Sequence, residues 1–119
     1  GLRAGRLSGE DHALRAMVGL PIDTLILNIL IPTPGTDYAA CTPPALEDVA
    51  RLFVDARLLL PRIRLVLGCM RPHGSYRQSV DELAIRLGLN GLVNPTHGAV
   101  RVATTLGLQI TWSDECCAF

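Results

Sequence analysis

The chain has 119 residues and a formal net charge of zero, and all eleven of its basic residues are arginine. Apolar residues make up 49% of the sequence, which is rich for one small domain and predicts a sizeable core. The absence of a basic stripe argues against nucleic-acid and anionic-membrane partners, and the longest apolar run, 24–31, is too short to span a bilayer.

Apolar segments alternate with segments of helical periodicity along the chain. Helix starts are signalled by capping residues or by proline in the first turn, and glycine or proline ends each helix. The expected caps are Ser8, Thr42, Ser75 and Thr96. The sequence predicts helices over 9–18, 43–60, 75–87 and 97–106, and strands over 24–31, 63–67, 91–94 and 108–112.

This order of elements predicts an α/β fold. Apolar strands separated by amphipathic helices are typical of a parallel sheet with helices outside it. No linker or low-complexity stretch divides residues 1–119, so a single domain is expected. The rhythm matches a partial (β/α)8 barrel with parallel strands and outer helices, a fold in which chemistry sits at the carboxyl ends of the strands.

Polar, glycine-rich and thiol-bearing residues gather where the predicted strands end. Turn formation alone accounts for many glycines and prolines in such loops. The turn 94–98 also offers free N–H groups to a phosphate or carboxylate, although every turn from strand to helix has this property to some degree. The four strand-end segments are 32–36, 68–74, 94–98 and 114–117.

Several interpretations of the cysteines remain open. A tetrathiolate zinc site needs paired C-x2-C spacing, which the chain lacks, and the side chains of adjacent cysteines diverge. A catalytic thiol is open on composition, with Cys69 beside His73 or His97. The α/β pattern favours reduced thiols in a cytoplasmic protein, with Cys41 as a structural residue. The four cysteines are Cys41, Cys69, Cys116 and Cys117.

Three stretches resemble, in order and spacing, the second half of biotin synthase, a radical S-adenosylmethionine (SAM) enzyme built on a (β/α)8 barrel. They are PIDTLILNILIPTPGT, TPPALEDVARLFVDARLLLPRIRLVLG and AIRLGLNGLV, and the resemblance covers roughly residues 20–95. The turn 5–9 is an approximate match to the G-x-I-x-G-x-x-E turn that passes close to the adenine of SAM in this superfamily. GCMRP and the ECC tail look closer to a branch related to biotin and lipoyl synthases.

The resemblance implies site residues but assigns no catalytic residue. Arg64 falls where biotin synthase has an arginine that ligates an auxiliary iron–sulfur cluster, and Cys69 falls where it has a second arginine. An inward-pointing Arg64 needs a carboxylate partner or a bound anion. The residues implied to bind a cofactor are Gly5, Gly9, Asn28 and Arg64, and the implied cluster ligands are Cys69, Cys116 and Cys117.

The C-x3-C-x2-C motif that holds the radical SAM cluster is absent from the 119 residues. The chain is therefore expected to be the C-terminal half of such a barrel, inactive alone. In the complete enzyme, SAM and an iron–sulfur cluster would drive radical C–H activation or sulfur insertion on a small molecule. The expected partner is a missing N-terminal half-barrel or a second copy. The alternative is a non-catalytic α/β binding or assembly domain that pairs to complete a barrel.

Overall fold

The computed structural model describes residues 1 and 3–115 as alternating helices and strands. In this described part of the chain, three parallel strands form one open sheet in the order β1-β2-β3. The prediction of an α/β fold with parallel strands and outer helices is thus confirmed, while the described residues do not close a barrel. The elements are α1 (Glu10–Met17), β1 (Thr24–Leu27), α2 (Leu46–Leu59), β2 (Arg64–Leu67), α3 (Ser75–Arg86), β3 (Gly91–Leu92) and α4 (His97–Thr105).

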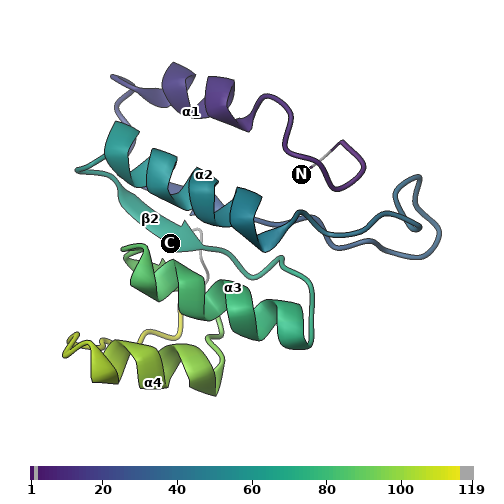
Figure 1. The fold of residues 1–119 in the computed structure, drawn as a ribbon. Helices are drawn as coiled ribbons and strands as arrows, with labels where there is room; N and C mark the ends of the chain where they lie inside the picture. Colours follow the sequence, from purple (N-terminus) through teal and green to yellow (C-terminus); the bar gives the residue numbers. More distant parts are fainter. Residues whose placement is uncertain (2, 116–119) are drawn as a thin grey trace.

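The four helices lie side by side in chain order, with β2 behind them (Figure 1). Side chains alternate between the two faces of a strand. Leu65 and Leu67 of β2 are fully buried against the helices, and Leu25 and Leu27 of β1 pack against the same core. The residues that alternate with these leucines along each strand therefore point to the opposite face of the sheet. The helices cover the face on which the four leucines lie.

The core lies between the sheet and helices α1, α2 and α3. Phe53 and Ala56 of α2 and Val80 and Ala84 of α3 are at most 1% exposed. They recur at helical spacing, which is the pattern that the sequence predicted for these faces. The buried cluster comprises Leu14, Ile29, Val49, Phe53, Ala56, Leu60, Leu65, Leu67, Val80, Ala84 and Leu89.

The predicted strand over 108–112 is wrong. These residues form no strand, and Leu108, Ile110 and Trp112 are 49%, 38% and 67% exposed. A strand persists only where a neighbour satisfies its N–H and C=O groups, and β3 offers just two paired residues, both bonded to β2. The strand predicted over 24–31 is also shorter, since pairing in β1 runs from Thr24 to Leu27.

Three of the four predicted helix caps are also wrong, and at α2 the N-cap position is held by Ala45 and not by Thr42. Gly9 and Gly74 occupy the N-cap positions of α1 and α3, with φ of 99° and 71°, so neither Ser8 nor Ser75 caps its helix. Thr96 caps α4 as predicted, because its side chain accepts a hydrogen bond from the Ala99 N–H. Among the described residues, none of the helices combines the length and apolarity that crossing a bilayer requires.

Candidate functional site

The loops after β2 and β3 meet at one end of the sheet, because the carboxyl ends of parallel strands share an edge. We call this end the rim and define it as residues 68–74 and 93–97. Exposed at the rim are Cys69, Met70, His73, Asn94 and His97. The site therefore presents a thiol, a thioether and two imidazoles at the place where a barrel enzyme would hold its substrate.

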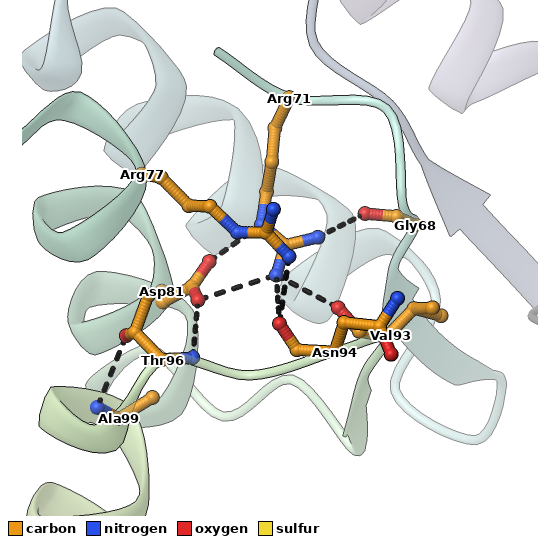
Figure 2. Close-up of polar contacts among 8 residues, drawn as sticks. All are labelled: Gly68, Arg71, Arg77, Asp81, Val93, Asn94, Thr96 and Ala99. Atoms are coloured by element: carbon orange, nitrogen blue, oxygen red, sulfur yellow. Dashed lines mark hydrogen bonds and ion pairs between the residues drawn. The ribbon is translucent and has the colours of Figure 1, made fainter. Parts of the chain in front are cut away.

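A buried ion pair holds the rim together. Arg71 and Asp81 have no exposed side-chain surface, and Arg71 Nε donates to Asp81 Oδ1 at 2.5 Å (Figure 2). A second contact of 3.2 Å joins Arg71 Nη2 to Asp81 Oδ2, so the pair is bidentate. Asp81 lies on α3, and the ion pair therefore ties the loop after β2 to the helix that follows it.

The remaining donors of Arg71 reach both rim loops. Its Nη1 donates to the carbonyl of Gly68 at 2.5 Å. Its Nη2 donates to the carbonyls of Val93 at 2.8 Å and of Asn94 at 3.2 Å (Figure 2). One guanidinium group thus satisfies carbonyl oxygens at the ends of both β2 and β3, and it fixes their spacing.

The carboxylate of Asp81 completes the network on the α4 side. Its Oδ2 accepts the Thr96 N–H at 2.9 Å, and Thr96 in turn caps α4. Arg77 adds a hydrogen bond of 2.7 Å to the Asn94 carbonyl. Within the described residues, no buried side-chain nitrogen or oxygen lacks a partner. A fully satisfied network of this kind holds the rim loops in place, so contact with a ligand at the rim would involve the exposed groups.

The structure uses Gly5 and Gly9 for local backbone geometry. Gly5 is buried with φ of 79°, and a Cβ there would collide with the carbonyl oxygen of Thr42. The close approach that Gly5 permits is therefore to the chain's own backbone. Gly9 is exposed at the start of α1, and a Cβ there would meet nothing within 4 Å.

Asn28 lies at the rim end of the sheet, and Arg64 lies at the other end. A Cβ on Gly68 would meet the side chain of Asn28, which places Asn28 beside the start of the loop that carries Cys69. Arg64 is exposed in the first position of β2. Five residues at 3.3 Å per residue separate the Cα atoms of Arg64 and Cys69 by roughly 16 Å. The predicted set is therefore split between the two ends of the sheet.

The predicted cluster ligands are described only in part. Cys116 and Cys117 lie outside the described residues. Cys69 is an exposed free thiol and Cys41 is a half-buried one. Across residues 1 and 3–115, no three His, Cys, Asp or Glu side chains are grouped so that they could hold a metal ion.

The sequence reasoning missed Arg71 and Asp81, which organise the rim. The available signal was Asp81 itself, a carboxylate next to Val80 on the apolar face of a predicted helix. Aspartate is almost never fully buried unless it is paired, so its position on that face indicated a buried cation. Which arginine supplied the charge was not apparent, because eleven arginines are spread along the chain.

Tyr76 anchors the loop before α2 to the start of α3. Its hydroxyl donates to the Pro44 carbonyl at 2.8 Å. Burial raises the pKa of Tyr76 from 10.0 to about 12. The neutral phenol is thus favoured in the folded state, so the associated stability is present below pH 10 and is lost as the pH rises toward 12.

We expect Tyr76→Phe to reduce the loss of stability between about pH 10 and 12. The chain has no lysine, so no side-chain ammonium group titrates in this interval. Urea denaturation at a series of pH values, followed by circular dichroism, measures the effect. Tyr38→Phe is the matched control, since Tyr38 is 37% exposed, and it is expected to keep the alkaline decline. An equal decline in both variants would contradict the assignment.

A separate apolar cavity lies beside β1, under α1 and α2. Its volume is about 370 Å³. Aliphatic and aromatic side chains dominate its lining, among them Leu14, Met17, Leu25, Leu27, Leu52 and Phe53. The cavity therefore suits an apolar occupant at the edge of the sheet.

Comparisons with known proteins assign no family to this geometry. No protein-family model matches the chain, and neither curated proteins nor solved structures give a significant match. The function is therefore inferred from the residues and from how the fold arranges them.

Proposed function

We propose that this chain is the substrate-side half of a (β/α)8 barrel of the radical SAM type that resembles biotin synthase, and that it acts once further strands close the barrel. The observation that carries the proposal is the open edge of β1, which faces an apolar cavity. An edge of this kind is a template for another strand.

Backbone groups along β1 alternate between its two edges. The carbonyls of Asp23 and Leu27 accept N–H groups of the β2 segment, and the Ile29 N–H donates to the Met70 carbonyl. The N–H and C=O groups of Thr24 and Ile26 therefore point to the other edge, where none of the described strands pairs. This edge supplies hydrogen bonds for an added strand.

The helix layer extends beyond the sheet on the same side. Over residues 3–115, four helices accompany three strands, and α1 packs against α2 (Figure 1). The apolar cavity under α1 borders β1. A crossover from a strand through α1 into β1 is right-handed in nearly all parallel sheets, which puts such a strand beside β1. An apolar strand at this place would cover the cavity and continue the sheet.

In the closed barrel, the rim would contact a small-molecule substrate. The exposed polar groups at that end include Cys69, His73, Asn94, His97 and the neighbouring Asn28. The Arg71–Asp81 pair would hold their loops in place while the substrate binds. Radical C–H activation or sulfur insertion, with SAM and an iron–sulfur cluster, is the chemistry that the resemblance implies for the assembled protein. The chain alone is expected to be inactive.

We expect the purified chain to self-associate through the β1 edge, with β1 of one copy beside β3 of another so that all strands stay parallel. Ile26→Pro removes a donor at the open edge without removing a bond to β2, and it is expected to shift the protein toward monomer. Sedimentation velocity over a range of protein concentrations measures the change.

Ile26→Ala is the matched control, because it shortens the same side chain and keeps the N–H group. It is expected to associate like the unmodified chain if pairing of the edge drives association. Circular dichroism establishes that both variants are folded. A monomeric mass for the unmodified chain at every concentration would contradict self-completion and would leave a separate half-barrel as the proposed partner.

A second candidate is a non-catalytic binding or assembly domain. Its support is the open edge of β1, which offers pairing to another strand whether or not the completed sheet is catalytic. Anaerobic reconstitution of the assembled protein with iron and sulfide separates the two candidates. Visible absorption of a cluster that is weakened in Cys69→Ser supports the radical enzyme, and its absence supports the binding domain.

A further inference from the structure

A second concave site lies at the amino ends of the strands, opposite the rim. Its volume is about 520 Å³. It combines the segment that enters β2, the segment that enters β3 and the chain after α4. We call it the arginine pocket, and its lining residues are Arg57, Pro61, Arg62, Ile63, Arg64, Asn90, Gln109 and Thr111.

Among the described residues, the lining carries three guanidinium groups and no carboxylate. Among the described residues, the ion pairs join the amino terminus to Glu10, Arg51 to Asp48, and Arg71 to Asp81. None of these pairs includes an arginine of the pocket. Within the described part of the chain, the pocket therefore gathers positive charge that forms no ion pair with a carboxylate.

Arg57 forms a fixed wall of the pocket. Its guanidinium donates to the carbonyls of Gly88 at 2.8 Å, Ile63 at 3.1 Å and Pro61 at 3.3 Å. It also donates to Asn90 Oδ1 at 2.5 Å. All these acceptors are neutral, so the hydrogen bonds hold the group in place and leave its charge uncompensated.

The amide of Asn90 is oriented by the same contacts. Its Oδ1 accepts from Arg57 and, at 3.0 Å, from the Leu65 N–H. Because the oxygen is engaged by donors from the protein, the two N–H donors of the amide remain for a ligand. Arg64 lies above β3, since a Cβ on Gly91 would be 3.7 Å from its Nη2.

We propose that the arginine pocket binds a small multivalent oxyanion, a compound with two or more phosphate or carboxylate groups. Guanidinium groups bind both kinds of oxyanion in bidentate geometry. Asn90, Gln109 and Thr111 supply uncharged donors around them. The site lies at the end of the sheet opposite the rim, and its existence does not depend on the barrel being completed.

Isothermal titration calorimetry at low ionic strength tests the proposal with two probes, inorganic pyrophosphate and citrate. We expect Arg64→Gln to weaken binding at least about tenfold, the effect of losing one charged hydrogen-bonding group. Arg62→Gln is expected to act in the same direction. Arg101→Gln is the matched control, because Arg101 is exposed on α4 outside the pocket and its replacement removes the same charge. Tighter binding of pyrophosphate identifies a phosphate ligand, and tighter binding of citrate identifies a carboxylate ligand.

Equal weakening in Arg64→Gln and Arg101→Gln would overturn the proposal, since it would show attraction by net charge alone. Asp114 and Glu115 follow Thr111 closely and are the nearest source of a competing carboxylate in sequence. The variant Asp114→Asn/Glu115→Gln is therefore titrated as well. Binding that appears or becomes tighter in this variant supports the proposal. If neither probe binds to the unmodified chain or to this variant, the proposal is overturned.

Discussion

Replacing Asp81 by alanine is expected to lower the free energy of unfolding by about 3–5 kcal/mol, because it strands a fully buried guanidinium without its counter-charge. Arg71 and Asp81 both have 0% exposed side-chain surface. The substitution also leaves the Thr96 N–H without its acceptor at the start of α4. Urea denaturation followed by circular dichroism measures the loss.

Asp48→Ala is the matched control for this prediction. Asp48 also pairs with an arginine, Arg51, but the two side chains are 45% and 71% exposed. An exposed pair of this kind contributes about 0–1 kcal/mol, so the control is expected to stay close to the unmodified chain. Equal losses in Asp81→Ala and Asp48→Ala would contradict the burial of the Arg71–Asp81 pair.

The double variant Arg71→Met/Asp81→Leu is expected to lose less stability than the sum of the two single variants, since it leaves no unpaired charge. It does not restore full stability. The carbonyls of Gly68, Val93 and Asn94 lose the donors that Arg71 supplies, and each buried acceptor without a partner costs about 1–3 kcal/mol. Additive losses would show that the two residues act independently.

Replacing Phe53 by alanine is expected to cost about 3–5 kcal/mol, the range for removing a buried aromatic side chain. Phe53 is 1% exposed in α2 and belongs to the central core cluster. It also borders the apolar cavity of about 370 Å³, so the space left by the ring would enlarge an existing void. The neighbouring side chains would then fill little of the space that the ring leaves.

Leu58→Ala in the same helix is the control for Phe53→Ala. Leu58 is 73% exposed, and substitutions at such positions usually change stability by less than about 0.5 kcal/mol. Thermal and urea denaturation of both variants give the comparison. A loss below about 1 kcal/mol for Phe53→Ala would show that α2 does not pack on the sheet through this face.

The two ends of the sheet have different characters in this protein. At the rim, the positive charge of Arg71 is neutralised by Asp81, and exposed groups are left to meet a ligand. In the arginine pocket, the charges of Arg57, Arg62 and Arg64 have no counterpart among the described residues. An anion is therefore expected at the amino ends of the strands, and a substrate at their carboxyl ends.

Helix positions and apolar faces were predictable from the sequence, because burial repeats along a helix with its own period. Leu46–Leu59 and Ser75–Arg86 lie within the ranges predicted for them. Buried strands were predictable at their centres for a similar reason. Their lengths were not, since the end of a strand depends on where its neighbour stops pairing.

The caps show the limit of local patterns. A serine followed three residues later by a polar residue predicts a capping box at Ser8 and at Ser75. In both places glycine takes the N-cap, where it adopts a positive φ at low cost. Thr96 has no glycine directly before or after it, and it caps α4 as predicted.

The α/β class, the order of the elements through α4 and the apolar helix faces could be read from the sequence, because they follow from the spacing of residues along one segment. Three features could not be read in this way: 108–112 forms no strand, Arg71 pairs with Asp81, and Arg57, Arg62 and Arg64 share one pocket. Each of these depends on groups from separate segments meeting in space. Backbone pairing and charge compensation depend on contacts between segments, and the spacing of residues within one segment does not specify them.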